Sequence, residues 1–364
     1  MYSESDLEAA VAAGALTPDA AASLRNYVAG ARATPVVDEE HFRLLTGFND
    51  IFVAVAAAIL LAALAMIGHW TGPNIDYDGP SPMSGLLVAI AAWGLAEFFT
   101  RKRRMALPSI LLLLAFVAAV FATSLFGLVL AVGVERVEDN EALISSVIAA
   151  SAAVAVAAAW FHWRRFRVPI TVAAGALAFS AGILGMIGMT VGDSARFEDI
   201  MMGFGLALGI GVFLFAMWWD ASDPRRETRR SDVAFWLHLL AAPLIVHPVF
   251  HLLGLTDGDA TVLEALVVLL LYVGLGVTAL AIDRRALLVS ALAYVLWALS
   301  SLFETVGPVE LNLALTAFVI GSGLLVLSAF WHQARRAVVK PLPAGLQSRL
   351  PVIDRPVAAA PLAA

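Results

Sequence analysis

The side chains best suited to chemistry within a membrane are three histidines in one apolar segment, residues 231–255. His247 and His251 are four positions apart, so on a helix they share a face, and two imidazoles at this spacing can reach one metal ion or one proton path. His238 lies nine residues before His247, about half a turn out of phase on a helix of about 3.6 residues per turn. We therefore take His247 and His251 as candidate metal ligands or proton carriers, and His238 as a packing or hydrogen-bonding residue.

Acidic residues follow at the same end of this segment. The polar connection to the next apolar segment is only about five residues long, so the two segments should be antiparallel neighbours, with Glu264 about one turn deep and level with His251. Asp257 and Asp259 lie in the connection, at the mouth of this predicted cluster. An ionisable side chain inside a span costs a few kcal/mol unless it is paired or hydrated, which indicates a binding site or proton path. The alternative is structural: the histidines bond to a neighbouring helix, and Glu264 reaches up to the membrane interface.

Other chemistries find little support in the sequence. The chain contains no cysteine, which excludes disulfides, thiolate metal sites and cysteine nucleophiles. Two histidines one helical turn apart cannot serve as opposite axial ligands of one haem. No nucleophile elbow, Walker lysine or zinc-protease pattern is present. We predict a protein that is not an enzyme, carries no cofactor and does not bind nucleic acid.

The elements that must position these residues are membrane-spanning helices. Hydrophobic residues make up 61% of the chain and charged residues only 14%, against roughly 45–50% and 25% in soluble domains. Apolar runs alternate with short polar loops, and the runs are long enough to cross about 30 Å of hydrocarbon as helices. We predict an all-α polytopic membrane protein with ten spans, at approximately 51–69, 83–100, 107–134, 142–163, 168–192, 200–219, 233–255, 261–282, 286–303 and 311–331.

The distribution of charge predicts the orientation of these spans. With ten spans, 21 of the 23 lysines and arginines fall on one side, and only Arg136 and Arg196 fall on the other. Short loops rich in Lys and Arg stay in the cytoplasm, so both termini are predicted to be cytoplasmic. The outer loops are strongly acidic. One interpretation is that the negative charge of these loops concentrates cations at an entrance. The alternative is that these acids are only solvated surface residues, common here because membrane insertion keeps Lys and Arg out of the outer loops.

Residues 1–34 are expected to form a cytoplasmic helical hairpin. Gly14 is typical of the end of a first helix, and Thr17 followed by Pro18 is typical of the start of a second. This hairpin either packs on itself or meets a protein partner.

The remaining segments flank the membrane domain. Residues 35–50 are predicted to be a linker with an interfacial helix that leads into the bilayer. Residues 51–331 form the transmembrane helical domain. Residues 332–364 become polar and then rich in proline and alanine, which predicts a disordered cytoplasmic tail.

Glycines and prolines within the spans indicate where helices approach one another. Gly205 and Gly209 have the spacing of a close helix contact, and Gly185 belongs to a similar series in the preceding span. Pro243 and Pro248 each remove an amide from their helix, so we expect a kink and two freed carbonyls that protein or water must cover.

Two further patterns concern the end of the bundle that is rich in Lys and Arg. Pro108 and Pro169 each follow an arginine-rich loop and open an apolar run, at an offset of 61 residues, which predicts hairpins repeated in the same orientation. This offset weighs against an inverted repeat of the transporter type. Glu97 is four residues before Arg101, a spacing suited to an ion pair on a helix.

The order of these parts resembles a class of predicted bacterial inner-membrane proteins of unknown function, in which an N-terminal helical hairpin precedes many spans joined by short loops. The resemblance rests on AVAAGALTPDAAASL in the hairpin, FNDIF at Phe48–Phe52 and IDRRALLVSALAY at Ile282–Tyr294. It implies an inner-membrane location and this topology, and it assigns no catalytic residue.

Three functions are then open. The chain is a non-catalytic membrane scaffold or sensor, a transporter or permeation protein for a cation or small solute, or an intramembrane enzyme. The last is disfavoured because no acid, base and nucleophile converge at one depth. The lipid bilayer is the one partner that composition requires.

Overall fold

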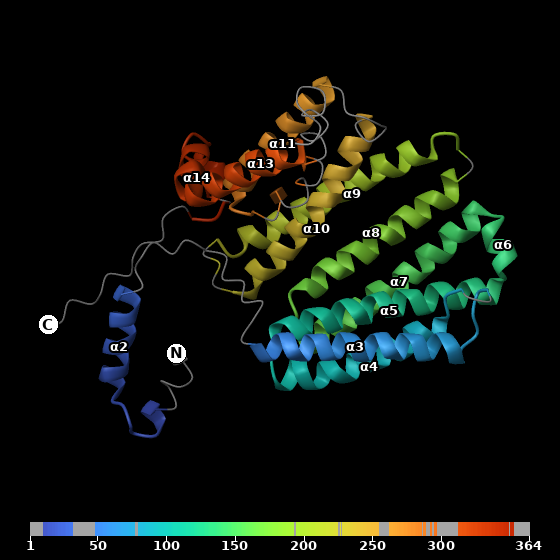
Figure 1. Cartoon of the computed structure of the whole chain (residues 1–364), viewed down its shortest axis with the longest axis horizontal. Helices are drawn as coiled ribbons and strands as arrows, with labels where there is room; N and C mark the ends of the chain where they lie inside the picture. Colours follow the sequence, from blue (N-terminus) through green and yellow to red (C-terminus); the bar gives the residue numbers. More distant parts are fainter. Residues whose placement is uncertain are drawn as a thin grey trace. The chain divides into compact units, whose positions relative to one another are not determined.

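All regular secondary structure in the described residues of the computed structural model is helical, and no strand occurs among them (Figure 1). The structure describes residues 10–31, 48–76, 79–192, 194–224, 226, 228–254, 262–285, 287–288, 292, 295–296, 312–348 and 350–352. The chain forms two compact units, Met1–Arg43 with Asp354–Ala364, and Leu44–Ile353.

The smaller unit contains the helix predicted after Thr17. Helix α2 (Pro18–Ala31) begins with proline, and the Thr17 hydroxyl accepts a hydrogen bond from the Ala20 amide at 3.2 Å. Gly14 ends the preceding helical turn with a φ of +71°, a backbone conformation that favours glycine. The residues between this unit and the first membrane helix, where the interfacial helix was predicted, lie almost entirely outside the described ranges.

The larger unit is a bundle of long apolar helices, as composition predicts for a multi-pass membrane protein. Seven helices within the described residues are long and apolar enough to cross a membrane: α3 (Phe48–Thr71), α4 (Pro82–Ala96) with the π-helix η1 (Glu97–Lys102), α5 (Ala106–Val132), α7 (Glu141–Phe166), α8 (Ile170–Val191), α9 (Phe197–Ala221) and α10 (Arg229–Leu252). Each of them coincides with one of the first seven predicted spans.

The C-terminal part of the bundle departs from ten regular spans. Helix α11 (Val262–Ile282) matches the eighth predicted span, and α13 (Asn312–Ala329) matches the tenth. A bend of 74° separates α13 from α14 (Trp331–Val339), so the described residues offer seven spans, or eight if this bent pair is one span. The predicted ninth span, 286–303, lies mostly outside the described residues. The short helices α6 (Val134–Glu138) and α15 (Ala344–Gln347) complete the described elements.

Neighbouring helices pair as hairpins. The most extensive packing joins α4 to α5, α7 to α8 and α9 to α10, and further contacts of α5 with α7 and of α8 with α10 link these pairs. Figure 1 shows α7 and α8 between the α3–α5 group and the group formed by α9, α10 and α11.

The hairpin repeat predicted from Pro108 and Pro169 extends further along the chain. Within the described residues, four non-glycine residues have a φ between 53° and 57°: Arg104, Arg167, Arg226 and Asp283. They are separated by 63, 59 and 57 residues, and each lies in the turn that follows a helix ending at the same end of the bundle. We call this end, defined by these four turns, the arginine-rich end. A left-handed backbone costs a side-chain-bearing residue roughly 1–2 kcal/mol, so its recurrence indicates a common turn geometry.

A surface ion pair ties two of these hairpins together. Glu97 accepts a hydrogen bond from Arg101 at 3.3 Å, as its spacing predicts. It also accepts two from Arg165 of α7, at 2.6 Å and 2.8 Å, which the sequence did not indicate.

Glycine allows close helix contacts at the predicted positions. A Cβ added to Gly209 of α9 would lie 2.6 Å from the Leu244 carbonyl oxygen of α10, and one added to Gly185 of α8 would lie 2.9 Å from the Ser145 carbonyl oxygen of α7. Pro248 has no amide hydrogen to donate to the Leu244 carbonyl, so this carbonyl lacks its usual helical hydrogen bond. Gly209 has no side chain, so its backbone packs directly against the Leu244 carbonyl and shields it from lipid. Helix α10 continues through both of its prolines.

Candidate functional site: a buried ionic cluster

The densest group of buried polar side chains lies at the arginine-rich end, where α9 ends and α10 begins. Side chains from four elements meet there, and we call this group the ionic cluster. Its members are Asp220 of α9, Arg226 of the following turn, Ser231 and His238 of α10, Asp283 and Arg284 after α11, and Trp331 and Arg335 of α14.

Asp220 is the centre of one half of the ionic cluster. Its two carboxylate oxygens accept hydrogen bonds from the Arg284 guanidinium, from Nη2 to Oδ1 and from Nε to Oδ2, the latter at 3.2 Å. His238 Nε2 lies 3.0 Å from the same Oδ2. The side chains of Asp220, His238 and Arg284 are at most 2% exposed, so this charge pair is withdrawn from solvent. Forked guanidinium–carboxylate pairs are among the strongest protein hydrogen bonds.

The geometry assigns a tautomer to His238. An ionised Asp220 can only accept, so the proton of the imidazole resides on Nε2. The other nitrogen, Nδ1, is buried and has no hydrogen-bond partner. A proton on Nδ1 would be left without an acceptor there, so the neutral imidazole fits the site. This placement confirms that His238 is a hydrogen-bonding residue.

Arg284 also holds the first turn of α10. Its Nη2 donates to the Ser231 carbonyl oxygen at 3.1 Å and to the Ser231 hydroxyl at 3.2 Å. The Arg284 amide bonds to the Ala279 carbonyl oxygen at 2.9 Å, which fastens the residue to the end of α11. Through its side chain and its backbone amide, Arg284 therefore joins the ends of three helices.

Asp283 is the centre of the other half. Its Oδ2 accepts from Arg226 Nη1 at 2.9 Å, and its Oδ1 accepts from the Trp331 indole at 2.7 Å, with Arg335 Nε 3.7 Å away. Burial by itself would raise the pKa of the Asp283 carboxyl, but the charges of Arg226 and Arg335 and the Trp331 hydrogen bond together hold that pKa below its ordinary value. Arg226 Nη2 also donates to the carbonyls of Ile282 and Asp283, at 3.0 Å and 2.9 Å.

Residues 332–348 and 350–352 form α14, α15 and their turns and contact the same cluster, in contrast to the disordered tail expected from residue 332 onward, and residues 353–364 of that predicted tail lie outside the described ranges. Arg335 is 1% exposed, and its guanidinium donates to the carbonyl oxygens of Pro351 at 2.6 Å and Val352 at 3.3 Å. Composition suggested disorder because residues 341–352 are rich in proline. Proline has no amide hydrogen, so a proline-rich segment leaves backbone carbonyls without hydrogen-bond donors. The buried Arg335 guanidinium supplies donors to two of these carbonyls and so holds the segment in place.

The ionic cluster is suited to joining helices. Each of its two central carboxylates is held by at least one guanidinium, and no group of three His, Asp or Glu side chains in the described part of the chain is placed to hold a metal ion. Removing one partner of such a buried pair typically costs about 3–5 kcal/mol, because the other charge remains buried alone.

The histidines predicted as ligands lie at the opposite end of α10. His251 is partly buried, and its Nε2 is 3.8 Å from carboxylate oxygens of both Glu198 and Asp199, in the first turn of α9. His247 is exposed on α10. The structure therefore places two acids of α9 beside His251, a pairing that the sequence did not predict.

The rest of the predicted outer cluster is beyond what the structure describes. Asp257 and Asp259 lie within residues 255–261, outside the described ranges. Glu264 belongs to α11, but its side chain is not among those described. The proposed meeting of Glu264 with His247 and His251 stays a prediction.

Sequence reasoning missed the ionic cluster because its charges directly follow apolar runs. Asp220 follows the run ending in Trp219, and Asp283 and Arg284 follow α11, so all three lie between predicted spans and nothing local marks them as buried. A single acid placed among tryptophans at the end of an apolar run is the signal that could have identified Asp220. Its partner Arg284 lies 64 residues away, and only the fold brings the two together.

No family model matches this chain, and no similar curated protein or solved structure was found.

Proposed function

We propose that this protein is a non-catalytic scaffold or sensor of the bacterial inner membrane. In this proposal about ten spans cross the bilayer, the arginine-rich end and both termini face the cytoplasm, and the N-terminal hairpin meets a protein partner. The excess of Lys and Arg at one end of the bundle supports the orientation.

The observation that carries the proposal is the closed pairing of the ionic cluster. Asp220 and Asp283 are engaged by guanidinium groups and by His238 or Trp331, so neither carboxylate is a vacant acid or base. Buried ion pairs add little net stability compared with apolar packing, but they demand one arrangement of their elements. A cluster that joins α9, α10, α11 and α14 therefore suits a protein whose task depends on a defined arrangement of helix ends.

Flux measurements in proteoliposomes test this function directly. Purified full-length protein should pass protons and divalent cations no faster than protein-free liposomes. Protein-dependent flux that disappears on joint substitution of His247→Ala and His251→Ala would favour transport and overturn the scaffold proposal.

The orientation can be tested with single cysteines, because the chain contains none of its own. Arg103→Cys at the arginine-rich end and Glu138→Cys at the opposite end are both at exposed positions. A membrane-impermeant maleimide should label the second variant in spheroplasts and the first only after lysis. The reverse pattern would refute the cytoplasmic assignment.

The partner at the hairpin is tested by photocrosslinking in cells. A photoreactive residue replaces Ala22 or Ser23, both exposed on α2, and Asp139 at the far end of the bundle serves as the control position. Discrete adducts at α2 that are missing at Asp139 are expected. Identical adduct patterns at all three positions would count against the hairpin as the contact.

Transport of a cation or small solute is the second candidate, and the surroundings of His251 favour it. An imidazole 3.8 Å from two carboxylates at the acidic end of the bundle is suited to relaying a proton or cation. Both acids are largely exposed, so solvent screens them. For this candidate, wild-type flux should exceed that of the double alanine variant, in the same liposome assay.

A further inference from the structure

A groove on the membrane face of the bundle lies between α7, α8 and α9. It has a volume of about 520 Å³, within the usual range for ligand sites of about 300–1,000 Å³. Its walls are aliphatic and aromatic apart from one hydroxyl, and they include Val156 of α7, Val172 and Ser180 of α8, and Gly211 and Phe215 of α9. The Ser180 hydroxyl is buried and has no hydrogen-bond partner.

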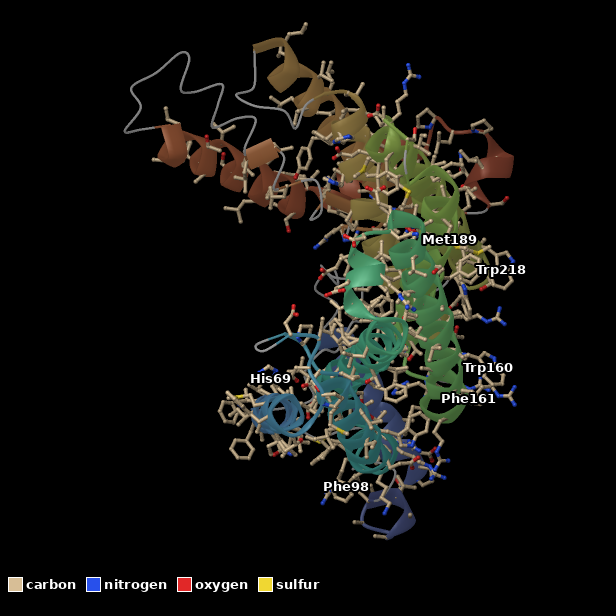
Figure 2. The ribbon with its side chains drawn as sticks, turned by 90° about the vertical axis from the view of Figure 1, so that its right-hand side faces the viewer. His69, Phe98, Trp160, Phe161, Met189 and Trp218 are labelled. Carbon is tan, nitrogen blue, oxygen red and sulfur yellow. The ribbon has the colours of Figure 1, made fainter. Side chains whose placement is uncertain are left out.

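Tryptophans stand where this groove reaches the arginine-rich end. Trp160 is one helical turn beyond the groove residue Val156 on α7, and Trp219 is one turn beyond Phe215 on α9. Trp163 and Trp219 pack in the same apolar cluster as the groove residues Val172, Ala176 and Val212. Figure 2 shows Trp160, Phe161 and Trp218 projecting from the same side of the ribbon. Tryptophan at such a position marks the level of lipid headgroups.

Three arginines surround these rings. The guanidinium carbons of Arg164, Arg167 and Arg230 lie 5.2 Å, 5.7 Å and 6.0 Å from the ring centroids of Trp160, Trp163 and Trp219. All three are exposed, and none pairs with a carboxylate among the described residues. Positive charge that has no carboxylate partner within the described part of the chain therefore stands above an apolar groove.

From this arrangement we propose that the groove is a binding site for an anionic phospholipid. One acyl chain occupies the groove between α7, α8 and α9, and the phosphodiester lies among Arg164, Arg167 and Arg230. The tryptophan rings set the depth of the glycerol region. Guanidinium groups bind phosphate oxygens in pairs, and basic pockets between membrane helices are known to hold anionic headgroups.

A lipid suits this site better than a partner helix does. The walls converge from three helices and leave a hollow, whereas helix pairing in membranes relies on close contact between faces of small residues. The charge above the groove also demands an anionic group at the interface, which a lipid headgroup supplies.

Native mass spectrometry of the delipidated full-length protein in detergent tests the headgroup. Dioleoyl phosphatidylglycerol should bind more tightly than dioleoyl phosphatidylcholine, which has the same chains and no net charge. Joint substitution of Arg164, Arg167 and Arg230 by Gln should weaken phosphatidylglycerol binding by about fivefold per arginine, and should weaken phosphatidylcholine binding less, because the choline cation offsets the charge of its phosphodiester. The matched control replaces Arg101, Lys102 and Arg103 by Gln, at the same end but beside α4. An equal loss in the control would overturn the proposal, because it would show a general charge effect.

The groove itself is tested by filling it. An added Cβ at Gly211 of α9 meets no atom within 4 Å, so Gly211→Leu occupies the groove without displacing the helices. It should weaken the binding of both lipids about tenfold or more, whereas Gly203→Leu, equally open and outside the groove, should not. Circular dichroism and elution volume verify that each variant is folded. Lipid binding to Gly211→Leu at wild-type strength, or a protein dimer in place of the lipid adduct, would refute the site.

Discussion

Replacing Arg284 by methionine should destabilise the protein by about 3–5 kcal/mol. The Arg284 guanidinium donates two hydrogen bonds to the Asp220 carboxylate and two to Ser231, and its side chain is 2% exposed. Methionine is also long and unbranched, so it keeps much of the packing and removes the charge. Asp220 then remains buried beside His238 without the guanidinium that balances its charge. Each net hydrogen bond to a charged group contributes about 1.5–3 kcal/mol, which for two such bonds agrees with the range above.

The assay is equilibrium unfolding in mixed micelles, followed by tryptophan fluorescence. Arg101→Met is the control, because Arg101 is 54% exposed and its ion pair with Glu97 is screened by water, so its loss should cost about 1 kcal/mol or less. Adding Asp220→Leu to Arg284→Met should recover part of the stability, because an apolar pair leaves no isolated charge. Two results would refute this reasoning. Arg284→Met could lower the free energy of unfolding no more than Arg101→Met does, or adding Asp220→Leu could lower that free energy further in place of restoring part of it. Either result would show that Asp220 and Arg284 do not act as a buried ion pair.

Three further predictions concern other parts of the bundle. Gly209→Ala should lower the free energy of unfolding by about 1–3 kcal/mol, because the added methyl group would meet the Leu244 carbonyl. Gly203→Ala is the control, because a methyl group there enters open space and should change the free energy of unfolding by less than about 1 kcal/mol. Equal effects of the two substitutions would contradict the close contact at Gly209. Folding lowers the pKa of the Asp283 carboxyl below its ordinary value of 3.8, so the unfolded chain binds a proton at this carboxyl more readily than the folded chain does. The contribution of Asp283 to stability is therefore complete above pH 3.8 and is lost as the pH falls through the folded-state pKa. Unfolding measured against pH should show this acid-side loss in wild type and not in Asp283→Asn, and parallel profiles would refute it. Glu97→Gln should cost only about 1 kcal/mol or less in the same assay despite its short contacts, since the pair lies at the surface, and a loss comparable to that of Arg284→Met would contradict this distinction.

Patterns local in the chain predicted the fold well. The first seven spans, the cap at Thr17, the turn at Gly14 and the ion pair of Glu97 with Arg101 all depend on residues within a few positions of one another. The repeat inferred from two prolines reappears in the left-handed turns of the arginine-rich end. The bend between α13 and α14 was not predicted, because no proline or charge interrupts the run at Phe330.

The candidate site was less predictable than the fold. His238 was predicted to be a packing or hydrogen-bonding residue, but its partner Asp220 was not predicted, because nothing in the sequence specifies how α9 and α10 are rotated against each other. Asp283 and Arg284 lie between two predicted spans, where a loop residue and a buried residue at a helix end look alike in sequence.

The sequence by itself determined that this is an all-helical, multi-pass membrane protein, because about 20 apolar residues in a row must form a helix wherever they lie in lipid. It also determined the regular hairpins and the charge difference between the two ends of the bundle. The tertiary structure alone decided which charges are buried and with whom they pair, because Asp220 meets Arg284 only when helices far apart in the chain pack together. In the same way, only packing places three arginines above one apolar groove, since hydropathy follows position along the chain and carries no information on which faces of α7, α8 and α9 meet.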